Sequence, residues 1–163
     1  MSKVIKEKPG PVVAGWREWV SLPGLDVRAI KVKLDTGART SALHARRIMP
    51  FERDGKVWVK FEVNPVQRGQ KIAIQCEAPV VSQRTVRSSS GQAETRYVIK
   101  TAVHLGDRHR MIEVTLTNRD EMGFRMLLGR SAMKRWLIVD SSKSFLQGKK
   151  PPLVKNYQEK EET

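Results

Sequence analysis

Short stretches that alternate apolar and polar residues recur along this sequence and constrain its fold most strongly. Residues 29–34 and 57–63 both place an apolar side chain at every second position. A period of two is typical of a β-strand with one buried face. Similar apolar runs predict further strands at 16–20, 72–75, 97–105, 111–116 and 137–139. Because turn residues separate these runs, we expect an all-β barrel or sandwich.

One region departs from this pattern near the C-terminal end. Met126, Leu127 and Leu128 form a continuous apolar run that Gly129 closes. Residues 130–136 then have the composition of a helix, with arginine, alanine, methionine and lysine. We therefore predict a buried strand followed directly by one short helix.

The ends of the chain are polar, and they set the predicted domain boundaries. We expect a flexible arm at 1–13, one domain at 14–148 and a disordered polar tail at 149–163. The first residues lack the apolar core of a secretory signal, and no run reaches the ~18 apolar residues of a membrane span. Cys76 is the only cysteine, so no intrachain disulfide can form. These features predict a cytoplasmic protein with no membrane partner.

The charge predicts an anionic partner without identifying it. Lysine and arginine number 31 against 17 acidic residues, which gives a net charge of +14. Such an excess attracts polyanions and speeds their encounter. One alternative is therefore a non-catalytic basic module that binds RNA or ribosomes. Its four tryptophans would then stack on bases: Trp16, Trp19, Trp58 and Trp136.

The candidate for chemistry is an Asp-Thr-Gly turn, Asp35 to Gly37, which follows the strand at 29–34. Two carboxylates about 3 Å apart share one proton, so one can activate a water while the other polarises a peptide carbonyl. Asp35 would supply one carboxylate, Thr36 would hold the loop, and Gly37 permits a close backbone approach. The same residues are also common in ordinary strand-end turns. Since the sequence has a single Asp-Thr-Gly, a dyad requires a second copy of the chain.

Metal and nucleotide chemistry have no support in the sequence. The three histidines, His44, His104 and His109, do not have the His-Glu-x-x-His spacing of zinc peptidases. A glycine-rich phosphate loop ending in Gly-Lys-Ser/Thr is also missing from the sequence. We predict neither a metal site nor a cofactor.

Three longer motifs make the reading more specific: residues 33–45, residues 84–91 with 96–99, and residues 126–130. Together they resemble the RimB-type retropepsin-like aspartic proteases over about residues 14–148. The resemblance implies a retropepsin-like acid protease barrel with one short C-terminal helix, assembled as a two-fold homodimer. It implies hydrolysis of α-linked polyglutamate, including the tails that a glutamate ligase adds to a small-subunit ribosomal protein. A chain of this fold that only binds acidic tails is a further alternative.

The predicted site combines the turn with nearby cations. The catalytic residues are Asp35, Thr36 and Gly37. Residues 80–99 are predicted to form a hairpin flap with a soft tip at 88–91. Arginine suits this site because its planar fork binds carboxylates through two hydrogen bonds, although any one arginine could also be solvated surface. The predicted substrate-binding residues are Ala38, Arg39, His44, Arg84, Arg87, Ser88, Ser89, Arg96 and Arg130.

Overall fold

A computed structural model describes residues 10–66, 72–87, 90–118 and 123–148 of the chain. Within these ranges the chain is almost entirely β-structure, with one short α-helix, as the alternating pattern predicts. The elements in chain order are β1 (Val12–Gly15), β2 (Arg17–Leu22), a 3₁₀ turn (Pro23–Leu25), β3 (Val27–Leu34), β4 (Ser41–His44), β5 (Arg46–Arg53), β6 (Lys56–Val63), β7 (Ile74–Arg87), β8 (Ala93–Leu105), β9 (Arg108–Thr117), β10 (Met126–Leu128), α1 (Arg130–Met133) and β11 (Leu137–Asp140).

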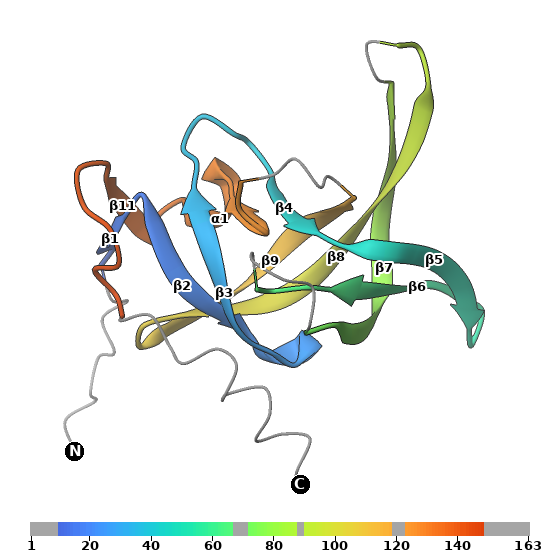
Figure 1. Cartoon of the computed structure of the whole chain (residues 1–163), viewed down its shortest axis with the longest axis horizontal. Coiled ribbons are helices and arrows are strands. Elements are labelled where there is room, and N and C mark those ends of the chain that lie inside the picture. Colours follow the sequence, from blue (N-terminus) through green and yellow to red (C-terminus); the bar gives the residue numbers. More distant parts are fainter. Residues whose placement is uncertain (1–9, 67–71, 88–89, 119–122, 149–163) are drawn as a thin grey trace, which may run out of the picture.

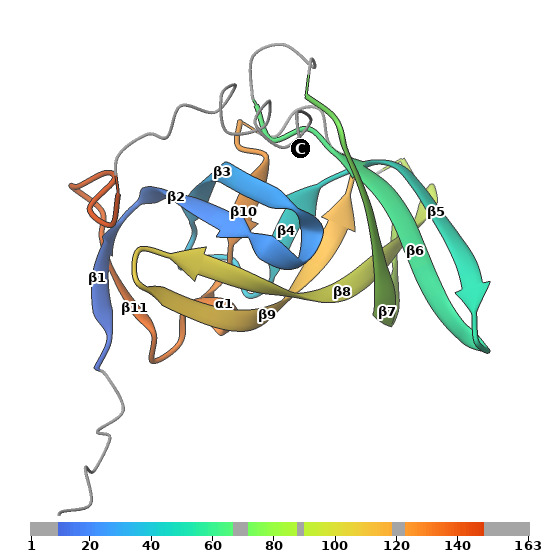
Figure 2. The ribbon, with the colours of Figure 1, turned by 90° about the horizontal axis from the view of Figure 1, so that it is seen from below.

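A closed barrel forms the centre of the molecule (Figures 1 and 2). In the described residues the large sheet has the order β2-β3-β10-β4-β9-β8-β7-β6-β5, and an additional pairing of β2 with β8 closes its first six strands. The side chains that point inward from these strands form the hydrophobic core. In β3, Ile30, Val32 and Leu34 are buried, whereas Lys31 and Lys33 face outward. Burying this apolar row stabilises the barrel by about 1.5–3 kcal/mol for each large side chain.

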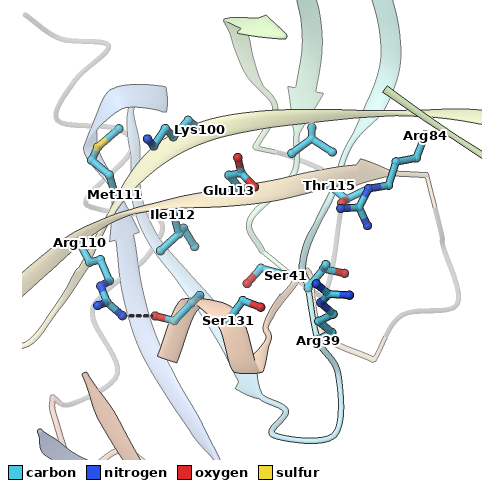
Figure 3. A pocket seen from close by; sticks show the side chains of 13 residues that line it. Arg39, Ser41, Arg84, Lys100, Arg110, Met111, Ile112, Glu113, Thr115 and Ser131 are labelled. Carbon is cyan, nitrogen blue, oxygen red and sulfur yellow. Dashed lines mark hydrogen bonds between the residues drawn. The ribbon is translucent and has the colours of Figure 1, made fainter. Parts of the chain in front are cut away.

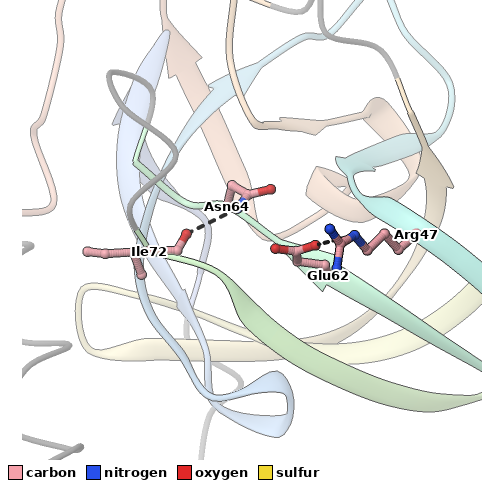
Figure 4. A network of polar contacts seen from close by, with 4 residues as sticks. All are labelled: Arg47, Glu62, Asn64 and Ile72. Carbon is pink, nitrogen blue, oxygen red and sulfur yellow. Dashed lines mark hydrogen bonds and ion pairs between the residues drawn. The ribbon is translucent and has the colours of Figure 1, made fainter.

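Strands β7, β6 and β5 extend the sheet beyond the barrel, and β5 forms its edge. Pro50 lies on this edge strand, where the missing backbone N–H disturbs no inner ladder. A bulge shifts the β5–β6 register between Arg46 and Met49, and Arg47 adopts a left-handed φ of 53° there. Its side chain pairs with Glu62 at 3.5 Å (Figure 4). These features make a twisted, charged edge that resists pairing with other chains.

Residues 64 and 72 lie at either end of the connection between β6 and β7. The side-chain amide of Asn64 donates to the Ile72 carbonyl at 3.2 Å (Figure 4). Asn64 itself is buried. The contact therefore fixes the distance between the end of β6 and the start of β7.

The two ends of the described chain meet in a separate parallel ribbon of β1 and β11. Glu18, which is fully buried on β2, organises the segment after β11. Its carboxylate accepts hydrogen bonds from the backbone N–H groups of Gly15 at 2.6 Å, Leu146 at 2.9 Å and Gln147 at 3.0 Å. One carboxylate thus joins the start of β2 to residues 146–147.

Several elements differ from the expectation. The predicted helix at 130–136 ends at Met133, because the chain leaves helical geometry at Lys134 and Arg135 has a φ of 64°. The strand predicted at 72–75 begins at Ile74 and continues to Arg87. Strands β4 and β5 were not predicted. Strand β1 begins at Val12, inside the segment interpreted as an arm, while residues 1–9 and the predicted tail lie outside the described residues.

No helix in the described ranges is long and apolar enough to cross a membrane.

Candidate active site

The Asp-Thr-Gly turn follows directly on β3 and is held by its own backbone. The Asp35 N–H donates to the Leu128 carbonyl at 2.8 Å, which continues the β3–β10 ladder by one residue. The Asp35 carboxylate accepts the Gly37 N–H at 3.0 Å, and the Asp35 carbonyl accepts the Ala38 N–H at 3.2 Å. Asp35 is half-buried, whereas Thr36 and Gly37 are exposed. The turn therefore presents a fixed carboxylate at the surface of the barrel.

Strand β10 places this turn, and its position explains why an apolar run ends in glycine at 129. β10 lies between β3 and β4, parallel to the first and antiparallel to the second. Leu128 is the register partner of Leu34, immediately before the turn. A side chain at Gly129 would collide with the backbone of Thr40, so this position excludes any Cβ. The predicted buried strand is thus the support on which the turn rests.

The first residues of α1 hydrogen-bond to the loop that follows the Asp-Thr-Gly turn. The Arg130 N–H donates to the Ala38 carbonyl at 2.7 Å, and the Ser131 N–H donates to the Arg39 carbonyl at 3.1 Å. The Ser41 hydroxyl accepts the Gly129 N–H at 2.9 Å in a buried position. Residues far apart in the sequence thus fix both sides of the loop.

Arg130, a predicted substrate-binding residue, contacts the loop itself. Its guanidinium donates to the Thr36 carbonyl at 3.2 Å. Both residues line a small cavity of about 130 Å³ together with Leu137 and Val139 of β11. Within the single chain, this contact fixes the position of the Asp-Thr-Gly turn.

A larger cavity of about 380 Å³ lies beside the loop, over the outer face of β8 and β9 (Figure 3). It brings together Arg39, which follows the turn, and Arg84, which comes from β7. Lys100 and Arg110 add two further cations, and Glu113 is the one acidic side chain among the described residues that line it. Two of the predicted substrate-binding arginines therefore share one basic pocket.

Lys100 and Arg110 are pocket residues that the sequence reasoning missed. Lys100 lies between the buried Ile99 and Thr101, so the alternation in β8 carried a signal for an outward cation. Arg110 gave no local signal, because its role depends on tertiary packing. Its guanidinium donates to the Ala132 carbonyl at 2.9 Å (Figure 3). It also donates to the Lys134 carbonyl at 2.8 Å, and the two hydrogen bonds hold the end of α1.

The remaining predicted residues lie elsewhere. His44 is fully buried, and it is not among the described residues that line the basic pocket. Arg96 is the register partner of Arg84, and it lies 3.9 Å from the Glu94 carboxylate. Arg87 is exposed near the end of β7. Ser88 and Ser89 lie outside the described residues.

The predicted hairpin at 80–99 is present. Strands β7 and β8 pair from Val80 with Ile99 out to Arg87 with Ala93, and the hairpin projects away from the barrel (Figure 1). Gly91 has a left-handed φ of 84° at the turn, a conformation that glycine adopts without strain. Because Arg84 lies on this hairpin and lines the pocket with Arg39, the hairpin and the segment that follows the Asp-Thr-Gly turn share this pocket.

The tryptophans do not form a shared stacking surface. Trp136 is buried, and Trp58 packs against Phe51 with a ring separation of 6.3 Å beneath Arg53. Trp16 and Trp19 are half-buried on and beside β2. This distribution gives little support to the RNA-binding alternative, which needs successive exposed rings.

Comparison with known proteins identifies the family. A family model described as retropepsin-like aspartic endopeptidase RimB matches residues 13–150. The chain belongs to this RimB-like family. The all-β barrel with one short helix that the described residues form is accordingly a retropepsin-like fold. A solved structure of Lpg0085 from Legionella pneumophila, a protein of unknown function, is similar with a TM-score of 0.68 and 29% identity, covering 83% of this chain and 98% of that one.

Curated relatives of this family member carry a different kind of name. A protein from Shewanella pealeana called probable alpha-L-glutamate ligase is 50% identical over 86% of this chain and 31% of its own length. A protein of the same name from Desulfotalea psychrophila is 46% identical over 100% of this chain and 34% of its own length. The chain thus spans about a third of the length of these relatives.

Proposed function

We propose that the chain is a homodimeric aspartic endopeptidase that hydrolyses α-linked polyglutamate. The observation that carries this proposal is the Asp35 turn, which is fixed by β10 and α1 beside a pocket lined by Arg39, Arg84 and Lys100. We further propose that its substrates include glutamate tails on a small-subunit ribosomal protein. The single cysteine is buried and forms no disulfide, which suits our proposal of a cytoplasmic location.

The chemistry requires two copies of Asp35 that share one proton. The ionised carboxylate takes a proton from water as the water oxygen attacks the peptide carbonyl carbon. The protonated carboxyl donates a hydrogen bond to the carbonyl oxygen. The carboxyl that took the proton from water then transfers it to the peptide nitrogen. The C–N bond of the tetrahedral intermediate breaks, which releases the amine and the new carboxyl group and leaves one proton on the dyad. Thr36 and Gly37 act by holding the two carboxylates in place.

A surface beside the catalytic turn supports pairing with a second copy. Val13 and Ile138 are register partners on the β1–β11 ribbon, and they are 47% and 54% exposed. The cavity that Thr36 lines also includes Leu137 and Val139 of the same ribbon. Two-stranded ribbons are marginal without a covering layer, and parallel strands are usually buried on both faces. A second copy would cover the ribbon and bring the two turns together.

The basic pocket supports an acidic substrate. Four cations face one carboxylate among the described lining residues, so the pocket holds excess positive charge. Arginine binds carboxylates through two hydrogen bonds, and the net charge of +14 would speed the approach of a polyanion. Relatives called glutamate ligases carry this domain within a chain about three times as long, which supports a functional link to glutamate addition.

These ligase names also favour a second candidate function. The domain could hold a glutamate tail for a ligase without cutting it, and the same basic pocket would serve that role. The two functions share the ligand class and differ only in hydrolysis. A cleavage assay therefore separates them.

The first prediction concerns substrate selectivity. We expect the purified protein to shorten α-linked oligoglutamate with a kcat/KM at least about 100-fold above that for oligoglutamine of equal length, because two lost charge-assisted contacts cost about tenfold each. Mass spectrometry of the products gives both rates. Raising the salt concentration should lower the glutamate rate by screening the attraction, and a chelator should leave it unchanged.

Either of two results would count against the proposal. Equal cleavage of both peptides would remove the acidic specificity. Tight binding of oligoglutamate with no cleavage by the wild-type dimer would favour the tail-holding module.

A further inference from the structure

A second basic surface lies on the outer face of β2 and β3, apart from the pocket described above. Arg17 and Lys33 are register partners on these neighbouring strands, and Trp19 is the partner of Lys31. The alternate residues Glu18 and Val32 are buried, so the cations point away from the core. We refer to Arg17, Lys31 and Lys33 as the β2–β3 basic face.

Aromatic rings hold two of these three cations. The Arg17 guanidinium lies 4.8 Å from the Trp16 ring centre and 5.0 Å from that of Phe145. The Lys31 ammonium lies 5.3 Å from the Phe124 ring centre. Contacts of this kind fix a cation in place without neutralising its charge.

Lys33 is the exposed member of the face. Its side chain forms no hydrogen bond or ion pair with any residue in the described ranges. Its cross-strand neighbours are Arg17 on β2 and Leu127 on β10. Like charges directly opposite one another destabilise a sheet. Glu18, the nearest acidic residue along β2, is buried and bonded to backbone N–H groups. The β2–β3 basic face therefore carries a repulsion that a bound anion would relieve.

The face leads directly onto the catalytic turn. Lys33 precedes Asp35 by two residues, and side chains two apart along an extended strand share a face. The extended ladder continues to Asp35 through its hydrogen bond to Leu128. In the sheet order, β2 and β3 lie on one side of β10, while β4, β9 and β8, which flank the Arg39 and Arg84 pocket, lie on the other. Cations thus flank the Asp35 turn on both sides.

We propose that Lys33, supported by Arg17, is a specificity-determining residue that binds a carboxylate side chain of the substrate on the β2–β3 side of the scissile bond. The enzyme would then require acidic residues on both sides of the bond it cuts. This inference rests on the proposed function, and its test separates the two.

The test measures binding in a background that cannot cut. In Asp35→Asn protein, we expect Lys33→Met to raise the Kd for fluorescently labelled α-linked oligoglutamate at least about tenfold by anisotropy, because each protomer of the dimer loses one charge-assisted contact. Lys33→Arg should keep the Kd within about threefold, since the charge remains. Lys56→Met removes an equal charge from the exposed start of β6 and should stay within about twofold.

The binding and cleavage results together separate the role of Lys33 from the peptidase proposal. Unchanged binding by Lys33→Met, while the wild type cuts oligoglutamate, would overturn the role of Lys33 and leave the peptidase proposal standing. Weakened binding with a wild type that never cuts would support Lys33 and refute the peptidase. The melting temperature of Lys33→Met should be equal or higher, because repulsion with Arg17 is relieved. A large fall that Lys33→Arg does not prevent would show a structural role instead and overturn the inference.

Discussion

Replacing Asp35 with asparagine should reduce oligoglutamate hydrolysis by at least about 10³-fold, because an amide can neither take a proton from water nor share one across a dyad. The fold should be retained. Asparagine keeps the side-chain oxygen that accepts the Gly37 N–H, and the Asp35 N–H to Leu128 contact involves backbone alone. Initial rates with oligoglutamate measure the loss, and thermal unfolding checks the fold.

A matched control is available on the same chain. Asp54 lies at the exposed turn between β5 and β6, so Asp54→Asn makes the same chemical change away from the site. It should keep the wild-type rate within about twofold. If Asp35→Asn were nearly as active as Asp54→Asn, the proposal that Asp35 is a catalytic residue would be wrong.

Replacing Glu18 with glutamine should lower the free energy of unfolding by about 2–4 kcal/mol. The glutamine NH₂ group is a donor, so it cannot accept a hydrogen bond from the backbone N–H groups that now bind the second carboxylate oxygen in this buried site. The carboxylate now satisfies the N–H groups of Gly15, Leu146 and Gln147. Urea denaturation followed by fluorescence measures the change, with the slope of the transition checked for two-state behaviour.

Glu52 provides the comparison for this change. It is exposed on the edge strand β5, and Glu52→Gln should alter stability by less than about 0.5 kcal/mol. If Glu18→Gln were as stable as Glu52→Gln, the carboxylate would not organise the junction of β1, β2 and the C-terminal segment. Losing the hydrogen bond from Gly15 to Glu18 would also disturb the β1–β11 ribbon, since Gly15 is the last residue of β1.

Much of the barrel could be predicted because its strands have one buried and one solvated face. Strand β3 shows this alternation cleanly, and it leads to the Asp-Thr-Gly turn. Strand β4 has four residues, too few to establish a period. Strand β5 is an edge with most side chains exposed, so selection for an apolar face is weak there. The ribbon of β1 and β11 depends on pairing between the two ends of the chain, which local sequence does not encode.

The candidate site divides in the same way between local and tertiary signals. Asp35, Thr36 and Gly37 form a contiguous motif, so their loop could be predicted. The nearness of His44 to that motif predicts a binding role, but its side chain is fully buried, and only the tertiary packing around β4 shows this. Lys33 was overlooked because an outward lysine on a strand is usually plain solvated surface. The proposed binding role of Lys33 depends on its neighbours Arg17 and Leu127, and only the sheet register shows that they lie beside it.

The shared dyad is tested most directly by mixing wild-type and Asp35→Asn subunits at a constant total concentration and allowing them to exchange. If each active site needs Asp35 from two chains, activity should follow the square of the wild-type fraction, and an equal mixture should retain about one quarter of the full rate. If a single chain sufficed, the equal mixture would retain about one half, and a linear dependence would contradict the dimeric aspartic peptidase.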